Sequence, residues 1–182
     1  MADFYQHHLN HEEIPLSDTQ LRAILGDPGK RIIAYHELEN MYNLDDLMAS
    51  SDSIVLLYES AYNTGHYVSV IRGIDGEGQR FVEVFDPYGD GIEASVSKYR
   101  YNRTNFLLRL ISNTPSTYKI WNTIGFQKHR IQSQVCGRYA CFRILHRDMP
   151  LKDFQTKLSG VRRHVEIDKF ITLLTDLNVR YK

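Results

Sequence analysis

Residues 53–88 have the sequence SIVLLYESAYNTGHYVSVIRGIDGEGQRFVEVFDPY, in which turn residues separate three β-rich runs, 53–60, 66–74 and 81–88. Because β-branched and aromatic residues dominate each run, we expect three consecutive strands. GIDGEG (73–78), between the last two strands, has a glycine spacing similar to that of a phosphate-binding loop. It lies between strands rather than before a helix, and no Lys-Ser or Lys-Thr pair follows it. We therefore interpret it as the turn of a β-hairpin.

Helices are expected on both sides of these strands. Ser17 can cap a helix over 17–25, where Gln20 completes a capping box and Gly26 follows the last turn. Strands in the middle of the chain and helices at both ends favour an α+β domain. Apolar spacing and β-propensity predict the remaining elements, which are helical segments over 36–49, 103–112, 136–147 and 166–177 and a strand over 118–122.

Length and composition describe a folded chain. The 182 residues are 42% hydrophobic and 24% charged, which is typical of a protein that buries a core without a disulfide or metal. No repeat or linker divides the sequence, so we expect a single domain over residues 1–182. His7, His8 and His11 lack further ligands with zinc spacing, and no metal site is predicted.

The sequence argues against a membrane protein, a secreted protein and a disulfide-stabilised scaffold. No apolar run approaches the roughly 18 residues of a membrane span, so no membrane partner is expected. The start, MADFYQHHLNHEE, lacks the basic and apolar regions of a secretory signal, so we expect a protein that is not secreted. Cys136 and Cys141 lie five residues apart, which excludes a disulfide scaffold and favours a reducing compartment.

Charge is unevenly distributed along the chain although its net value is zero. Residues 1–60 hold 3 basic and 11 acidic residues, a balance of −8, and residues 61–182 hold 19 basic and 11 acidic residues, a balance of +8. The segment 98–163 has 14 basic residues and 2 acidic ones, a balance of +12. Such a segment can bind DNA, or it can pack beside the acidic N-terminal third. We favour the packing interpretation, because the aromatic-basic alternation of a nucleic-acid platform is missing.

Residue types that together support thiol catalysis occur in three short segments. A cysteine is a nucleophile as its thiolate, and a helix N-terminus beside an imidazolium lowers its pKa. A histidine can accept and return a proton near neutral pH, and a carboxylate can fix its tautomer. Cys136, His66 and Asp86 have these properties. The segments are Gly-His-Tyr at 65–67, Phe-Asp-Pro-Tyr-Gly at 85–89 and Ser-Gln-Val-Cys-Gly-Arg-Tyr at 133–139.

Each of these residues also has an interpretation without catalysis. A histidine at a strand start is often a hydrogen-bonded or surface residue, Asp-Pro-Tyr-Gly is a good turn in its own right, and a cysteine at a helix start often packs in the core. The hairpin favours the triad, because it brings the start of strand 66–74 beside the end of strand 81–88. His66 and Asp86 should therefore be neighbours.

Taken together, the order and contexts of His66, Asp86 and Cys136 resemble those of the adenovirus-type, adenain-like viral maturation cysteine proteases. These are relatives of the ubiquitin-like-protein proteases, and the resemblance is strongest to the enzymes of virophages and large DNA viruses. It covers roughly residues 50–147, with weaker similarity at 32–47. It implies a papain-like or adenain-like fold, in which a central, mostly antiparallel sheet is flanked by helices and the nucleophile begins a helix. It also implies Cys136 as nucleophile, His66 as general base and Asp86 as its partner.

The resemblance further implies a glutamine before the cysteine that helps to form the oxyanion hole. The family places it six or seven residues upstream, where this chain has Arg130 and His129. We choose Gln127, with Gln132 as the rival. A second departure is Tyr67, where the family commonly has tryptophan; tyrosine still offers a flat aromatic wall.

The implied function is that of a thiol-dependent endopeptidase that processes viral capsid precursor proteins during virion maturation and cleaves after glycine. We expect a monomer that acts in the virion and at the host-cell assembly site. No cofactor is required, and DNA is a candidate activator and partner.

Three alternatives stay open. The first is a deubiquitinase or deSUMOylase-type isopeptidase that acts on a host modifier. The second is an acyltransferase, which is disfavoured because no cofactor-binding extension is evident. The third is a non-enzymatic module that binds DNA or the capsid, and the intact set of His66, Asp86 and Cys136 argues against it.

Overall fold

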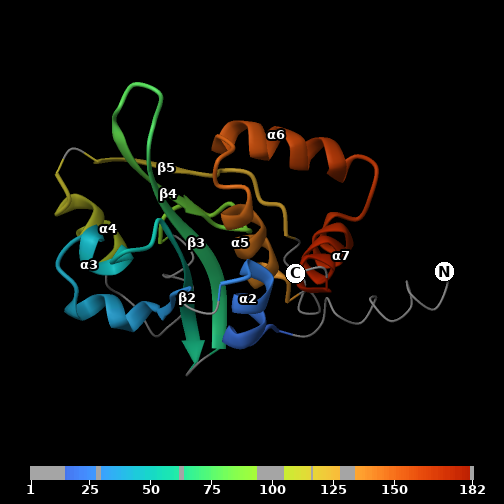
Figure 1. Cartoon of the computed structure of the whole chain (residues 1–182), viewed down its shortest axis with the longest axis horizontal. Helices are drawn as coiled ribbons and strands as arrows, with labels where there is room; N and C mark the ends of the chain where they lie inside the picture. Colours follow the sequence, from blue (N-terminus) through green and yellow to red (C-terminus); the bar gives the residue numbers. More distant parts are fainter. Residues whose placement is uncertain are drawn as a thin grey trace.

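The computed structural model describes residues 15–27, 30–61, 64–93, 105–115, 117–127 and 134–180. It is an α+β structure in which helices flank a five-stranded sheet (Figure 1). The strands lie in the sheet in their sequence order: β1 (Ile32–Ala34), β2 (Ser53–Ala61), β3 (Thr64–Ile74), β4 (Arg80–Phe85) and β5 (Thr117–Trp121).

The sheet is mixed rather than mostly antiparallel. β2, β3 and β4 pair antiparallel, as the hairpin predicted, but β1 pairs parallel with β2 and β5 pairs parallel with β4. The two edge pairings join segments that are far apart in sequence, so no turn signal announces their direction. β1 is three residues long and was not predicted from the sequence.

The turn at 73–78 is the predicted β-hairpin turn. The Asp75 carboxylate accepts the backbone N–H groups of Glu77 at 2.9 Å and Gln79 at 2.8 Å. Gly78 has a φ of 80°, a left-handed conformation that glycine adopts at little cost. The tip of the hairpin projects beyond the rest of the sheet (Figure 1).

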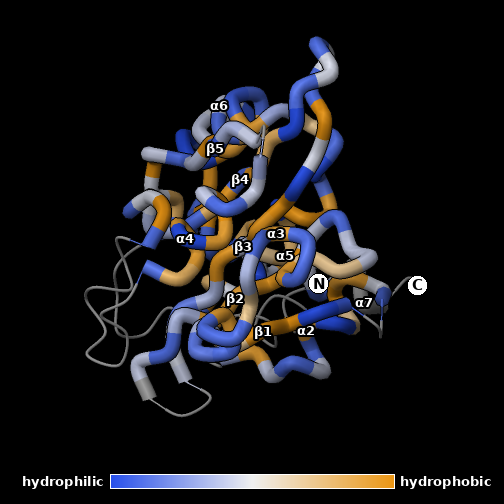
Figure 2. The backbone as a smooth tube through the Cα atoms, turned by 90° about the vertical axis from the view of Figure 1, so that its left-hand side faces the viewer, coloured by the Kyte–Doolittle hydropathy of each residue, from blue (hydrophilic) through white to orange (hydrophobic). Residues whose placement is uncertain are grey.

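Helices cover both faces of the sheet. The first face packs against η1 (Tyr35–Asn40), α3 (Leu44–Met48) and α4 (Phe106–Ser112). The second packs against α2 (Asp18–Leu25) and α5 (Cys136–Leu145), beside α6 (Leu151–Arg162) and α7 (Ile167–Arg180). Figure 2 shows the hydrophobic residues along the strands that these layers bury.

The predicted helix over 36–49 is divided into η1 and α3. The break occurs because Asn43 caps a new helix: its side chain accepts the N–H of Asp46, and the Asp46 carboxylate accepts the N–H of Asn43 in return. By contrast, α2 has the predicted capping box of Ser17 and Gln20. α6 was not predicted, and the first residues of the helix expected over 103–112 lie outside the described residues.

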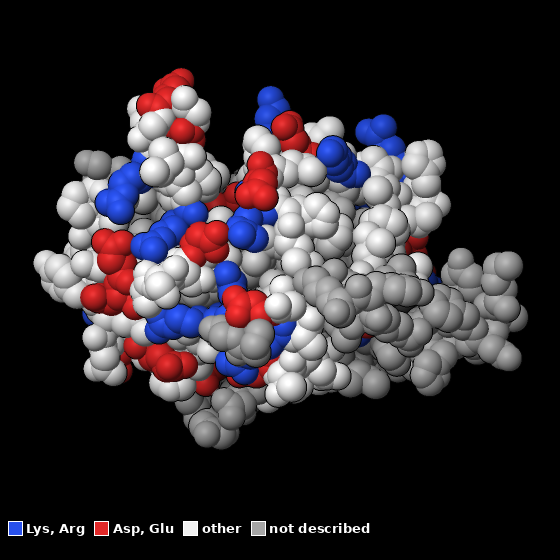
Figure 3. All heavy atoms as spheres, viewed as in Figure 1, with Lys and Arg blue, Asp and Glu red and all other residues white. Residues whose placement is uncertain are grey.

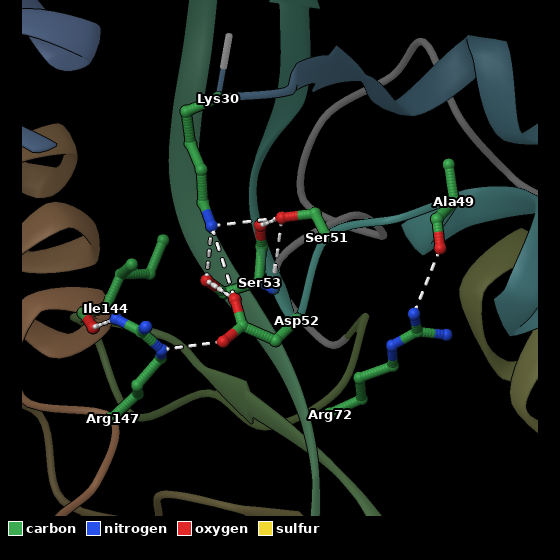
Figure 4. Close-up of polar contacts among 8 residues, drawn as sticks. All are labelled: Lys30, Ala49, Ser51, Asp52, Ser53, Arg72, Ile144 and Arg147. Carbon is green, nitrogen blue, oxygen red and sulfur yellow. Dashed lines mark hydrogen bonds and ion pairs between the residues drawn. The ribbon is translucent and has the colours of Figure 1, made fainter. Parts of the chain in front are cut away.

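A polar cluster joins the starts of β1 and β2 to the end of α5. Figure 4 shows the Lys30 ammonium among Ser51, Asp52 and Ser53, with Nζ 2.6 Å from Ser53 Oγ. On its other side the Asp52 carboxylate accepts Arg147 Nε at 2.8 Å. The cluster therefore connects the acidic N-terminal third to the basic part of the chain.

The surface supports the packing interpretation of the charge asymmetry. Arg72 forms an ion pair with Asp45, and Arg147 forms one with Asp52. Two basic residues of the segment 61–182 thus pair with two acidic residues of the segment 1–60. Figure 3 shows Lys and Arg interspersed with Asp and Glu over this face. Within the described part of the chain, every helix is too short or too polar to cross a membrane.

A buried ion pair connects α5 to the sheet. Arg143 donates from Nε and Nη2 to the two carboxylate oxygens of Glu83 at 2.6 and 2.8 Å, and both side chains are at most 2% exposed. The same guanidinium donates to the carbonyls of His146 and Met149, and it lies 4.9 Å from the ring centre of Phe154. One cation thus fixes the end of α5, the corner that leads to α6, and β4.

We predict that Glu83→Ala lowers the free energy of unfolding by about 3–5 kcal/mol, because it leaves the Arg143 charge buried without its carboxylate. Chemical denaturation measures this change. The matched control is Asp45→Ala, which breaks the exposed pair with Arg72 and should cost less than about 1 kcal/mol. Equal losses in the two variants would contradict the prediction.

Candidate active site

Cys136 is the first residue of α5, as predicted. The residue before it, Val135, has no side chain that caps the helix, so the N-terminal N–H groups of α5 remain available to a negative charge. Cys136 is buried against the second face of the sheet, in a cluster that also holds Tyr67 and Leu21. Hydrogen bonds from the backbone of Tyr67 and Gly137 reach the sulfur.

His66 and Asp86 are in contact, as the hairpin predicted. His66 Nε2 lies 2.7 Å from Asp86 Oδ1, and the two residues are 1% and 0% exposed. The last registered pair of β3 and β4 is Ser69 with Phe85. Continued by one step, the same register places residue 86 opposite Val68, two residues from His66 on the same face of β3.

The phenol ring of Tyr88 covers His66. The two ring centres are 4.3 Å apart and the planes are inclined by 15°, so the rings are stacked. Tyr88 also donates its backbone N–H to Asp86 Oδ1 at 2.8 Å. The turn at 86–89 thus supplies both the partner of the imidazole and one wall beside it.

Gly65 and Gly137, the neighbours of His66 and Cys136 in the sequence, have steric reasons to be glycine. A Cβ on Gly65 would lie 2.0 Å from the Tyr58 carbonyl oxygen of the neighbouring strand. A Cβ on Gly137 would lie 2.8 Å from Leu21 Cδ2 and 3.3 Å from Tyr67 Cδ2. Glycine at 137 therefore allows the start of α5, and Cys136 with it, to approach β3 closely.

The electrostatics of His66 and Cys136 are complementary. Burial alone lowers the pKa of His66, but the hydrogen bond to Asp86 and the interaction with Cys136 outweigh it and raise that pKa to about 9. Burial alone raises the pKa of the Cys136 thiol, but the interaction with His66 and the backbone donors outweigh it and lower that pKa. Asp86 occupies Nε2, and the buried Nδ1 has no partner within hydrogen-bond distance among the described residues, so Nδ1 is the ring nitrogen left to exchange a proton with the sulfur. The two pKa shifts therefore favour the thiolate of Cys136 and the imidazolium of His66.

The second cysteine of α5 differs from Cys136 in its electrostatics. Cys141 is fully buried, its S–H donates to the Leu21 carbonyl at 3.7 Å, and burial raises the pKa of its thiol. It therefore stays a neutral thiol at physiological pH, as expected of a residue that packs in the core.

Gln127 lies beside the Asp86 turn. It is 4% exposed, and its backbone N–H donates to the Pro87 carbonyl at 3.1 Å; Phe126 donates to the same carbonyl at 2.9 Å. The loop that follows β5 is therefore bound to the turn that holds the carboxylate. The rival, Gln132, lies outside the described residues. The role of Gln127 in an oxyanion hole stays a prediction.

One buried residue of the site was missed in the sequence. Asn122 is 0% exposed, and its carboxamide accepts the backbone N–H of Asp86 and donates to the backbone carbonyl of Asp86. The only sequence signal is a polar residue at the end of strand 118–122. Asn122 reaches Asp86 only because β4 and β5 pair in parallel, and this pairing cannot be predicted from the sequence.

A hollow of about 530 Å³ lies elsewhere, between the projecting hairpin tip and the start of α6 (Figure 3). Its lining residues include Ile74, Tyr118, Met149, Arg143 and Glu83. His66 is at the opposite end of β3, so this hollow is separate from the triad.

Comparison with known proteins gives weak similarities. No family model matches the chain. An uncharacterized protein of Sputnik virophage is 24% identical over 176 residues, which are 91% of this chain and 96% of the relative. Among solved structures, the central domain of an uncharacterized Legionella pneumophila protein aligns with a TM-score of 0.46 and 14% identity, covering 91% of this chain and 97% of that one. The similarity to the virophage protein supports a virophage-related origin of the chain.

We predict that iodoacetamide alkylates Cys136 and spares Cys141 in the folded protein at pH 7. The rate should fall as the pH drops through the lowered pKa of Cys136, because protonation removes the thiolate. In His66→Ala the fall should occur about one pH unit higher or more, since the cationic partner is gone. Mass spectrometry of the labelled peptides measures both rates. A pH midpoint that is the same with and without His66 would contradict the pairing.

Proposed function

We propose that this protein is a cysteine endopeptidase that processes viral capsid precursor proteins during virion maturation and cleaves them after glycine. The observation that carries the proposal is the buried His66, which lies between the Asp86 carboxylate and the thiol at the N-terminus of α5, with opposite pKa shifts on His66 and Cys136. A core histidine and a core cysteine have no need of such shifts, whereas a thiol nucleophile does.

The reaction begins at sulfur. The Cys136 thiolate attacks the carbonyl carbon of the scissile peptide bond, and the carbonyl oxygen becomes an oxyanion. The backbone N–H of Cys136 and the side-chain amide of Gln127 stabilise this charge, the second of these by family resemblance. The His66 imidazolium then gives its proton to the leaving nitrogen, so that the C–N bond breaks and a thioester remains.

Water completes the cycle. His66, now neutral, takes a proton from a water molecule that attacks the thioester carbonyl, and the C–S bond breaks to release the acid and the Cys136 thiolate. The imidazolium is thereby restored. Asp86 stabilises the cation through Nε2 in both halves of the reaction, and the Tyr88 ring limits the rotation of the imidazole.

The viral setting rests on two separate supports. The relationship to a virophage protein supports a viral source, and the adenain-like resemblance of the segments around the triad supports maturation of capsid precursors and glycine before the cut. The adenain-like fold itself is part of the proposal: its support is a nucleophile that begins a helix packed on the antiparallel strands of the His and Asp. DNA remains a proposed activator.

Cleavage of a purified capsid precursor tests the proposal. We expect the wild type and Cys141→Ser to cut after glycine at similar rates, and Cys136→Ser to be slower by about 10³-fold or more, because the hydroxyl is far less acidic than the thiol. Cys141→Ser is the matched control, since it changes the other cysteine of the same helix. Gel analysis and mass spectrometry locate the cut.

Three results would overturn the proposal. Cleavage by Cys136→Ser at the wild-type rate would exclude Cys136 as the nucleophile. Cleavage of a ubiquitin or SUMO conjugate, with the capsid precursor left intact, would instead establish the isopeptidase alternative. Binding of DNA without any hydrolysis would favour the non-enzymatic module.

A further inference from the structure

Asn122 occupies the point where β5 leaves the sheet. β5 runs parallel to β4, and Val84 is registered with Trp121, so the two strands end side by side. Asn122 follows Trp121 directly, and Asp86 comes two residues after Val84. An asparagine on one strand end therefore faces the backbone of the aspartate on the next.

The Asn122 carboxamide makes three hydrogen bonds there. Its Oδ1 accepts the Asp86 N–H at 2.7 Å, and its Nδ2 donates to the Asp86 carbonyl at 2.6 Å and to the Ile124 carbonyl at 3.1 Å. The side chain is completely buried, so water cannot replace these bonds. Both polar backbone groups of Asp86 are thus held by one side chain.

The backbone fixed in this way sets the direction of the Asp86 carboxylate. Its Oδ1 receives the Tyr88 N–H at 2.8 Å and His66 Nε2 at 2.7 Å, while the Asp86 carbonyl also receives the Gly89 N–H at 2.8 Å. Pro87 follows Asp86 and has no N–H of its own. The turn is held on one side by its own N–H groups and on the other by Asn122.

We propose that Asn122 is a positioning residue: it acts on the reaction through Asp86, by holding that carboxylate in line with His66 Nε2. The proposal rests on the proposed function only in that His66 and Cys136 act as a pair. Hydrogen bonds from outer residues commonly orient the groups that do the chemistry, and small misplacements of those groups are costly. Asn122 itself does not touch the imidazole or the sulfur.

A positioning role predicts a consequence that a structural role does not. If the carboxylate turns away from Nε2, the imidazolium loses stabilisation, and the thiolate that depends on it loses stabilisation as well. The pH at which Cys136 becomes reactive then rises in the protein that remains folded. A residue that only stabilises the fold changes the amount of folded protein and leaves this pH unchanged.

The test is the pH dependence of Cys136 alkylation by iodoacetamide, in proteins that all carry Cys141→Ser. For Asn122→Ala we expect the midpoint to rise by about one pH unit, a tenfold loss of thiolate at a pH below the midpoint. Asn122→Ser retains one polar group and should give a smaller rise in the same direction, which keeps the test valid if the alanine variant does not fold. Circular dichroism defines the folded fraction of each protein.

Asn113→Ala is the matched control. Asn113 also donates from Nδ2 to a backbone carbonyl, that of Tyr42 at 2.8 Å, but it lies at the end of α4 and away from the triad. Its midpoint should equal that of the parent protein. If Asn122→Ala and Asn122→Ser lower thermal stability and leave the midpoint in place, the positioning role is overturned.

A double-mutant cycle tests whether Asn122 acts on the reactivity of Cys136 through Asp86. In an Asp86→Asn background the carboxylate charge is already lost, so Asn122→Ala should add little to the shift of the midpoint. A full additional shift would show that Asn122 does not act through Asp86 and would overturn the proposal.

The readout also separates this inference from the proposed function. A shifted midpoint in a protein that cleaves no capsid precursor would retain the role of Asn122 and reject the proposed substrate. Normal cleavage of the precursor with an unshifted midpoint would retain the protease and reject the role of Asn122.

Discussion

The antiparallel register of β3 and β4, in which Ser69 pairs with Phe85, determines where the polar residues of the site lie. It brings the Asp86 turn beside the start of β3, so that the carboxylate reaches His66 and the Tyr88 ring stacks on the imidazole. α5 packs on the same strand closely enough for its first residue, Cys136, to meet the other side of the imidazole. A shift of the β3 register by one residue would turn the His66 side chain to the opposite face of the sheet, where it could contact neither Asp86 nor Cys136.

Burial gives the triad its electrostatic character. Two nearly inaccessible groups, His66 and Asp86, can remain charged because each finds its partner within hydrogen-bond distance, and an unpaired charge at this depth would be costly. The same burial raises the pKa of the Cys141 thiol, which has no imidazolium beside it. For Cys136 the interaction with His66 and the backbone N–H donors outweigh burial and lower the pKa of the thiol. Two cysteines of one helix therefore have opposite chemistry.

Short sequence motifs correctly predicted the elements that depend on neighbouring residues. Ser17 and Gln20 defined α2, the turn at 73–78 defined the hairpin, and the hairpin placed His66 beside Asp86. Pairings between distant segments were not predictable: the parallel edges β1 and β5 come from such pairings, and β5 is what gives Asn122 its role. A capping box at Asn43 divided a helix that apolar spacing alone had joined.

The protonation state of His66 is the most direct test of the account. Nitrogen-detected NMR of the ring should find both nitrogens protonated at pH 7 in the wild type, with the imidazolium lost only as the pH rises through about 9. In Cys136→Ser the same transition should occur at lower pH, because the thiolate no longer stabilises the cation. A neutral His66 at pH 7 in the wild type would contradict the thiolate–imidazolium pair and the catalytic role built on it.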